Sequence, residues 1–219
     1  MPILLSAAIL VAAYLLGSIP FGYLLVKAIS GKDVRTIESG RTGGTNTMRA
    51  TGFATGFTTS LLDMLKSATA VWIARYLVPD LYWLQVLAGF IAVLGHNFSI
   101  FLIERDDSGK VTFGGGAGGT PAIGAIVGFW WPSFLILIPA GYLLVMVIGY
   151  ASLATLSLPL IGSLILLVRF LKYDQPWEYV LSGLLSEILI IWALRPNIKR
   201  LINGTERLVG FRAKKKEEG

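Results

Sequence analysis

The chain has no cysteine and a single histidine, His96, among its 219 residues. The absence of cysteine excludes a disulfide framework, a catalytic thiol and a thiolate metal site. One histidine is too few for the zinc sites that proteins build from this residue, and we expect neither a metal nor a cofactor. Charge is also scarce, because 15% of the residues are charged, whereas a soluble domain has roughly a quarter. The chemistry must therefore come from hydroxyl, amide and charged side chains or from the backbone.

Hydrophobic residues are abundant instead, at 54% of the chain, and the mean hydropathy is +0.69. A bilayer core about 30 Å thick requires about 20 helical residues per crossing. The expected crossings lie at about 3–27, 54–78 and 81–103, within 111–168, and at about 178–194. The first run lacks the basic start and the small-residue cleavage site of a signal peptide, so we expect it to be retained.

The stretch 111–168 contains no Asp, Glu, Lys or Arg. At roughly 1.5 Å per helical residue it is long enough for about three crossings, with breaks expected near 130–132 and 149–152. The sequence thus predicts an all-α, polytopic integral membrane protein with seven transmembrane helices. Residues 1–211 would form one transmembrane domain, and 212–219 a disordered cytoplasmic tail.

Lysine and arginine are distributed unequally over the two sides of this arrangement. Of the 19 in the chain, Lys66 falls inside a span, and only Arg75, Arg169 and Lys172 fall on the side of the N-terminus. The positive-inside rule therefore places the N-terminus outside and the C-terminus in the cytoplasm. The basic tail is interpreted as a topology determinant or a contact to anionic lipid, and no nucleic acid partner is expected.

Three polar stretches, 38–52, 113–120 and 195–206, then share the cytoplasmic face. The first two repeat a G-x-x-G-G-T pattern that ends at Thr45 and Thr120. Glycines let consecutive backbone N–H groups approach an anion closely. The second loop runs into Thr120 and a proline, which predicts a helix N-cap whose dipole also favours an anion. The alternative is that these glycines serve only turns and helix packing. Because two such loops share a face with arginines, we favour a phosphate site.

Several polar side chains near these loops have both a functional and a structural interpretation. Ser39 is either a hydroxyl of the site or a turn residue. Arg49 is either a phosphate ligand or a snorkelling charge that sets topology. Asp63 and Lys66, spaced i,i+3 inside the second span, form a structural ion pair at least as readily as a catalytic pair. His96 is more readily an interfacial histidine than an acid or base.

Taken together, these motifs resemble the bacterial membrane glycerol-3-phosphate acyltransferases of the PlsY type, which use acyl phosphate as the donor. The resemblance rests on Gly17 to Gly22, Ser39-Gly40, Gly43, Thr45-Asn46, Arg49, Asp63 with Lys66, Gly95-His96, the second glycine loop, Asn197 to Leu201 and Gly204 to Glu206. It implies a seven-helix, monomeric enzyme of the cell membrane with a cytoplasmic active site. Such an enzyme transfers a fatty acyl group to the 1-hydroxyl of glycerol 3-phosphate, giving lysophosphatidic acid and phosphate in phospholipid biosynthesis.

The resemblance also implies roles for individual residues. Ser39, Arg49 and Asn197 would be catalytic, with Arg49 clamping a substrate phosphate through its planar fork. The substrate-binding residues would be Gly40, Arg41, Gly43, Thr45, Asn46, Lys66, His96, Gly115, Gly116, Gly118, Arg200 and Glu206. The glycines of the second loop would cradle the headgroup of acyl phosphate.

The chain departs from the pattern of this family at several positions. Gly114 and Ala117 stand where the second loop usually has lysine, and Leu194 stands where the third motif usually has histidine. Arg41 takes the place of an asparagine, and Arg41 or Lys110 is expected to restore the lost positive charge. These replacements support a second hypothesis, a non-catalytic or transporting relative that binds a phosphorylated lipid or solute. The odd helix count does not suit the inverted repeat of a transporter.

Overall fold

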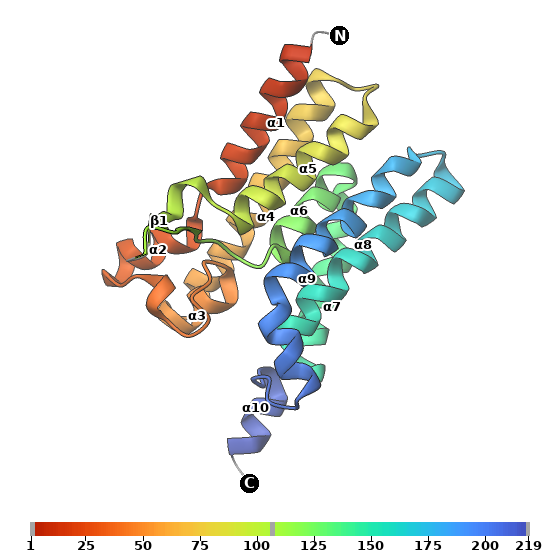
Figure 1. Cartoon of the computed structure of the whole chain (residues 1–219). Coiled ribbons are helices and arrows are strands. Elements are labelled where there is room, and N and C mark those ends of the chain that lie inside the picture. Colours follow the sequence, from red (N-terminus) through yellow and green to blue (C-terminus); the bar gives the residue numbers. More distant parts are fainter. Residues whose placement is uncertain (1–2, 106–107, 218–219) are drawn as a thin grey trace.

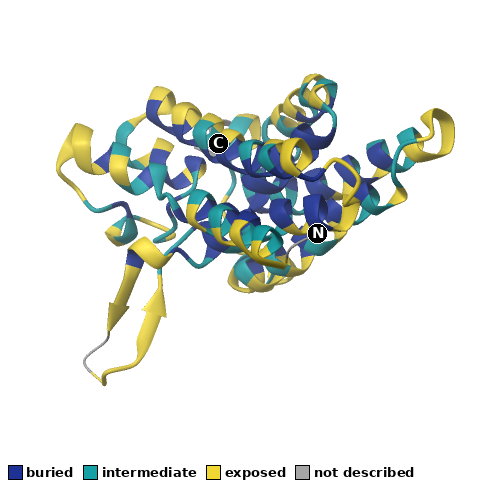
Figure 2. Cartoon of the chain, turned by 90° about the horizontal axis from the view of Figure 1, so that it is seen from above, coloured by how far each residue is buried: buried dark blue, intermediate teal, exposed yellow. Residues whose placement is uncertain are grey.

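The structure, a computed structural model, describes residues 3–105 and 108–217 (Figure 1). Its helices are α1 (Ile3–Ser18), α2 (Phe21–Ser30), α3 (Gly44–Thr51), α4 (Phe53–Leu77), α5 (Tyr82–Asn97), α6 (Gly119–Phe129), α7 (Phe134–Leu143), α8 (Ala151–Tyr173), α9 (Leu181–Ile202) and α10 (Gly210–Glu217). Short 3-10 turns lie at Val34–Thr36, Ile100–Leu102, Trp131–Ser133 and Trp177–Val180, and a π-helical turn at Leu144–Ile148. Strands β1 (Ile103–Arg105) and β2 (Val111–Phe113) pair antiparallel in an exposed hairpin that projects from the bundle (Figure 2). The start of α1 and the end of α10 lie at opposite ends of the molecule (Figure 1).

Five segments of the described chain are long and apolar enough to cross a membrane. They are Ile3–Ser30, Tyr82–Leu102, Trp131–Ile148, Ala151–Tyr173 and Trp177–Ile202. Two of the seven expected crossings do not meet these criteria, because α4 carries buried charges and α6 has only 11 residues. At roughly 1.5 Å per residue, α6 covers about 16 Å, about half of a bilayer core. Length and composition therefore support five crossings.

The first expected crossing, 3–27, is divided into two helices. α1 ends at Ser18, and α2 begins at Phe21 and turns away from the axis of α1 (Figure 1). Pro20 causes the break, because proline has no N–H to donate and disfavours helical geometry in the residue before it. The carbonyl of Ile19 accepts a hydrogen bond from Lys66 Nζ at 2.8 Å. The ammonium of Lys66, on α4, thus donates a hydrogen bond to the backbone carbonyl at the break between α1 and α2.

The uncharged stretch 111–168 also begins differently from the expectation. Residues 111–113 form β2, and a loop follows, so the first helix of this stretch is the short α6. The two expected breaks are confirmed, near 130–132 by a 3-10 turn and near 149–152 by Gly149, whose φ is +81°.

Helix α6 lies at the centre of the bundle, and ten of its eleven residues are buried. A Cβ added at Gly124 would lie 2.1 Å from the carbonyl oxygen of Met64, and one added at Gly128 would lie 2.7 Å from Val71. The missing side chains therefore let α6 pack directly against α4, as small residues do between membrane helices. This contact fixes the N-terminal end of α6 inside the molecule, where it reaches the cavity described below.

The C-terminal segment is helical through Glu217, where the sequence predicted a disordered tail at 212–219; residues 218–219 lie outside the described part. Its start is tied to the turn after α7, because Val209 N donates to the carbonyl of Gly149 at 2.8 Å. Arg212 Nη1 also donates to the carbonyl of Ile148 at 3.0 Å.

Candidate active site

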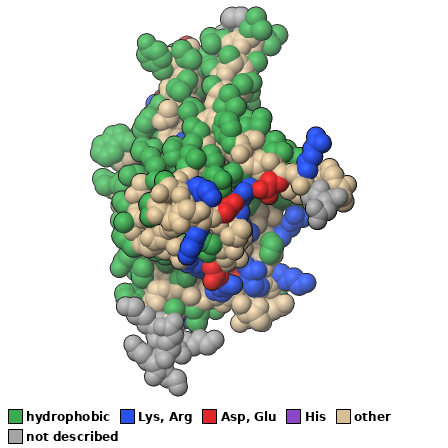
Figure 3. All heavy atoms as spheres, turned by 90° about the vertical axis from the view of Figure 1, so that its left-hand side faces the viewer, with side chains coloured by type: hydrophobic (Ala, Val, Ile, Leu, Met, Phe, Trp, Pro, Cys, Tyr) green, Lys and Arg blue, Asp and Glu red, His purple; other side chains and the backbone are tan. Residues whose placement is uncertain are grey.

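A cavity of about 370 Å³ lies between the first polar loop, the start of α6 and the C-terminal part of α9. The sequence predicted that this part of α9 faces the cytoplasm. Charged side chains gather around α2, α3 and the hairpin, whereas hydrophobic side chains cover the end where α1 starts (Figure 3). The expected site residues that line the cavity are Ser39, Arg41, Gly43, Thr45, Asn46, Arg49, His96, Gly118, Asn197, Arg200 and Glu206. Gly40, Lys66, Gly115 and Gly116, also expected at the site, are not part of the lining. The structure thus brings the three polar stretches together.

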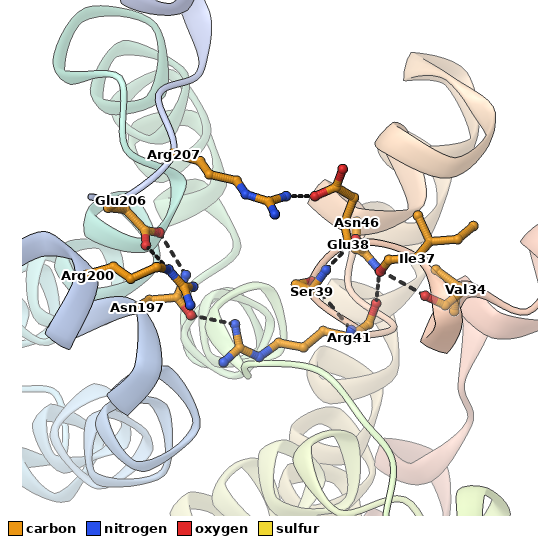
Figure 4. A network of polar contacts seen from close by, with 10 residues as sticks. All are labelled: Val34, Ile37, Glu38, Ser39, Arg41, Asn46, Asn197, Arg200, Glu206 and Arg207. Carbon is orange, nitrogen blue, oxygen red and sulfur yellow. Dashed lines mark hydrogen bonds and ion pairs between the residues drawn. The ribbon is translucent and has the colours of Figure 1, made fainter. Parts of the chain in front are cut away.

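Asn46 shapes the first loop from within. Its amide Nδ2 donates to the carbonyls of Val34 at 3.0 Å and of Ile37 and Arg41 at 2.9 Å each (Figure 4). Its Oδ1 accepts a longer hydrogen bond, 3.4 Å, from the backbone N–H of Ser39. The side chain is 2% exposed. Asn46, expected as a substrate ligand, therefore positions Arg41 through its amide donor and Ser39 through its amide oxygen.

Arg49 lies on the separate helix α3, where the sequence placed it near the start of the second crossing. α3 packs closely on α4, because a Cβ added at Gly44 would lie 2.0 Å from Ser60 Oγ, and one at Gly56 would lie 2.4 Å from Met48. The exposed guanidinium of Arg49 lines the cavity. Within residues 3–105 and 108–217 it forms no hydrogen bond or ion pair with another side chain, so it is available to an anion.

Arg41 joins the first loop to α9. Its Nη1 donates to Asn197 Oδ1 at 2.8 Å, and its Nη2 donates to the carbonyl of Ala193 (Figure 4). Asn197 Nδ2 in turn donates to Glu206 Oε1 at 2.7 Å, and Arg200 Nε donates to Glu206 Oε2 at 2.8 Å. Burial, reinforced by the charge of Arg200, lowers the pKa of Arg41, but guanidinium groups remain protonated in proteins. Arg41 therefore places a half-buried positive charge at the cavity.

The cavity carries uncompensated positive charge. Arg200 and Arg207 each form an ion pair with a glutamate of the cavity wall (Figure 4). In the described chain, Arg41 and Arg49 form no ion pair with a carboxylate, and both line the cavity. Lys110, the other residue expected to restore positive charge, lies outside the lining. A site with two guanidinium groups and no matching carboxylates favours a doubly charged anion such as a phosphate monoester.

The second loop presents the start of α6 to the cavity. The helix begins at Gly119 with Gly118 as its N-cap, two residues before the expected cap Thr120. Gly118 has φ +92°, a left-handed conformation that glycine adopts without strain. The N–H groups of Gly119 and Thr120 have no acceptor within the helix, and both residues line the cavity. The helix dipole adds about half a positive charge at this place.

Gly115 and Gly116, expected to contact phosphate, pack against the end of α5. The N–H of Gly116 donates to the carbonyl of His96 at 3.0 Å, and the carbonyl of Gly115 accepts from Thr42 N at 3.1 Å. A Cβ added at Gly116 would lie 1.9 Å from His96 Nε2. These glycines let the loop lie against the end of α5, and the backbone that faces the cavity begins at Ala117.

A buried charge network borders the cavity, because Asp63 and His96 are part of the lining. Lys66 Nζ is 2.7 Å from Asp63 Oδ1, which confirms the ion pair that the i,i+3 spacing predicted. The same ammonium is 3.0 Å from His96 Nδ1. The third member of the network is thus His96.

Sequence reasoning missed several cavity residues. They are Glu38, Ser60, Ala151, Ser152, Thr155, Pro196, Thr205 and Arg207. Ser152 and Thr155 follow the break near 149–152, which the crossing count had placed on the cytoplasmic face. That placement was the available signal for these two hydroxyls, because it set them beside the polar loops.

Glu206 makes this wall sensitive to acid. Burial alone would raise the pKa of its carboxyl, but hydrogen bonds from Asn197, Arg200 and Ser152 together hold the pKa below its usual value. A depressed pKa contributes stability that is present above the unfolded-state value, about 4.3, and is lost as the pH falls through the folded-state value.

We expect Glu206→Gln to lower the melting temperature in detergent at neutral pH, because hydrogen bonds to a charged group contribute about 1.5–3 kcal/mol each. The variant should also lose part of the decline in melting temperature that the parent shows below pH about 4.3. Melting curves of both proteins between neutral and acidic pH test this. Identical acid profiles would mean that Glu206 does not carry the effect.

Fold and cavity together define a multi-pass membrane protein with an arginine-lined cavity between its helices. The sequence profile of the family described as Glycerol-3-phosphate acyltransferase matches residues 7–204. The chain therefore belongs to the glycerol-3-phosphate acyltransferase family.

Individual relatives agree with this assignment over nearly their whole length. Glycerol-3-phosphate acyltransferase 3 of Dehalococcoides mccartyi is 35% identical, covering 94% of this chain and 96% of its own. Glycerol-3-phosphate acyltransferase 2 of Moorella thermoacetica is 36% identical, covering 93% and 97%. The crystal structure of PlsY, an integral membrane glycerol 3-phosphate acyltransferase in its glycerol 3-phosphate form, is similar with a TM-score of 0.78 and 31% identity, covering 94% of this chain and 96% of PlsY.

Proposed function

We propose that this protein transfers a fatty acyl group from acyl phosphate to the 1-hydroxyl of glycerol 3-phosphate, releasing lysophosphatidic acid and inorganic phosphate. The observation that carries the proposal is the pair of arginines, Arg41 and Arg49, that line one cavity without carboxylate partners in the described chain. The start of α6 adds backbone donors at the same cavity. The names of the relatives support glycerol 3-phosphate as the acceptor.

The reaction needs no nucleophile from the protein. Acyl phosphate is a mixed anhydride, so phosphate leaves readily when an alcohol attacks its carbonyl carbon. The acceptor oxygen forms the new ester bond, the bond from the carbonyl carbon to the phosphate oxygen breaks, and phosphate departs with the electron pair. The proton of the hydroxyl passes to the departing phosphate. Catalysis then consists of holding two anionic substrates together and stabilising the charge that develops between them.

The cavity offers a separate place for each substrate phosphate. Arg49 would bind the acceptor phosphate through its free fork, and the start of α6 would bind the donor phosphate through the N–H groups of Gly119 and Thr120. Arg41 would place a positive charge between the two phosphates. The acyl chain would enter sideways from the bilayer between helices. We place α4 and α6 as the remaining two of seven crossings, with the cavity facing the cytoplasm, a monomer as the functional unit and the cell membrane as the location.

Purified protein in detergent, incubated with palmitoyl phosphate and radiolabelled glycerol 3-phosphate, should form labelled lysophosphatidic acid and release one phosphate per product. Palmitoyl-coenzyme A replacing palmitoyl phosphate should give no product if acyl phosphate is the donor. Binding of either substrate without product would instead support the non-catalytic relative.

We expect Ser39→Ala to reduce turnover about tenfold, the effect of losing one hydrogen bond at the reacting centre. The hydroxyl of Ser39 lines the cavity and accepts only a long hydrogen bond, 3.4 Å, from Arg41 N, so its loss should leave the fold intact. Ser30→Ala is the matched control, because Ser30 Oγ donates to the carbonyl of Val26 away from the cavity. Normal turnover of Ser39→Ala would mean that Ser39 serves only as a turn residue.

A further inference from the structure

Three groups surround the ammonium of Lys66. Its Nζ lies 2.8 Å from the carbonyl oxygen of Ile19, 2.7 Å from Asp63 Oδ1 and 3.0 Å from His96 Nδ1. A lysine ammonium has three N–H donors and no acceptor, so toward each of these neighbours Lys66 can only donate. The side chains of Lys66 and Asp63 are 3% and 2% exposed. A neutral Lys66 would leave a buried carboxylate without its cation, which is strongly unfavourable.

This arrangement fixes the tautomer of His96. Because Lys66 can only donate, Nδ1 of the imidazole must accept, and the ring hydrogen must be on Nε2. A hydrogen on Nδ1 would face the ammonium at 3.0 Å, and its one alternative acceptor in the network, Asp63 Oδ1, is farther away at 3.4 Å. The network thus holds a neutral imidazole whose hydrogen is on Nε2, on the side of the ring away from Lys66.

The far side of the ring faces the second loop. His96 lines the cavity, and Nε2 is the atom nearest to a Cβ built on Gly116. Gly116 is the last residue before the cavity-facing segment Ala117 to Thr120. Within the described chain, Nε2 has no protein acceptor. A hydrogen-bond donor without a partner is therefore held next to the start of α6.

We infer that His96 donates a hydrogen bond from Nε2 to the phosphate of the acyl donor, and that Lys66 and Asp63 act as positioning residues that impose this tautomer. The inference rests on the proposed function and adds a donor where this chain has Gly114 and Ala117 in place of lysine. The neutral imidazole contributes a directed N–H without a further buried charge. Lys66 itself is outside the cavity lining, and its ammonium contacts Ile19, Asp63 and His96.

The single histidine of the chain makes the tautomer directly measurable. Protein labelled with 15N-histidine, purified without a histidine tag, gives nitrogen signals from His96 alone. We expect Nδ1 to resonate as a pyridine-type nitrogen and Nε2 as a pyrrole-type nitrogen. Addition of a non-hydrolysable acyl phosphonate should shift the Nε2 signal, and Lys66→Met should abolish the preference for one tautomer. Lys172→Met, at the end of α8 and far along the chain from this network, should leave both signals unchanged.

Two amide substitutions separate the two nitrogens functionally. The amide of glutamine places a donor at the ε position, as Nε2 does, whereas the amide of asparagine reaches only the δ position. His96→Gln should keep the KM for acyl phosphate within a few-fold of the parent value. His96→Asn should raise it about tenfold, the effect of one lost hydrogen bond, with the KM for glycerol 3-phosphate unchanged in both variants.

The outcomes distinguish this inference from the proposed function. Three results would overturn the inference even in an active enzyme. They are an imidazole with its hydrogen on Nδ1, an imidazolium, and an Nε2 signal that does not shift when the phosphonate is added. Equal donor KM values for the folded glutamine and asparagine variants would overturn it as well. Failure of the proposed function would show separately, as parent protein that forms no lysophosphatidic acid. If one variant does not fold, the spectrum of the parent protein with and without phosphonate still decides the matter.

Discussion

Arg49→Ala is expected to raise the KM for glycerol 3-phosphate about 100-fold, with the KM for acyl phosphate changed far less. Loss of a charge-assisted contact to a buried anion costs several kcal/mol, and each 1.4 kcal/mol corresponds to a factor of ten in affinity. Because Arg49 has no hydrogen bond or ion pair to any part of the chain that the structure describes, the melting temperature should stay near that of the parent. Steady-state kinetics with each substrate varied in turn measures the two KM values.

Two further arginine variants sharpen this test. Arg49→Lys keeps the charge but not the planar fork, so its acceptor KM should lie between those of the parent and Arg49→Ala. Arg195→Ala is the matched control, because Arg195 stacks on Trp192 outside the cavity lining. An acceptor KM that is the same in Arg49→Ala and in Arg195→Ala would remove Arg49 from the acceptor site.

Gly118→Val is expected to raise the KM for acyl phosphate strongly, and more than the KM for glycerol 3-phosphate. Gly118 has φ +92°, which a β-branched residue rarely adopts, and an added Cβ would lie 2.7 Å from Asn97 Oδ1. The substitution must therefore displace the start of α6, whose N–H groups are the proposed phosphate ligands. Gly109→Val is the control, because Gly109 has φ +82° but no atom within 4 Å of an added Cβ. Equal donor KM values in the two variants would contradict a phosphate site at the start of α6.

Ala117→Lys should have the opposite effect at the same place. Ala117 lines the cavity beside Gly118, so a lysine there would add a compact cation near the donor phosphate. The KM for acyl phosphate should fall, and the gain should shrink as the ionic strength rises. A donor KM that is independent of this substitution at low salt would mean that the loop does not face the donor.

Hydrophobic runs, the unequal distribution of basic residues and the repeated glycine motif were sufficient to predict a helical membrane protein with a phosphate site on one face. Local patterns carry this information because a bilayer imposes a fixed length of apolar helix. The same criteria misjudged α2 and β2, since hydropathy alone does not register the turn that Pro20 imposes or the short hairpin around Gly109. They also cannot separate the two roles of glycine in the second loop, because close packing and anion binding both require the absence of a side chain.

The amino-acid sequence by itself determined the chemical inventory of this protein: no thiol, one histidine, arginines and glycines in three polar stretches, and apolar segments between them. The tertiary structure decided which of these groups can meet a substrate. The N–H of Gly116 is used by the end of α5 while Gly119 and Thr120 face the cavity, and Arg41 reaches a residue 156 positions away. Such partners depend on how helices cross and where their ends meet, and contacts between distant segments leave no periodic signal in the chain.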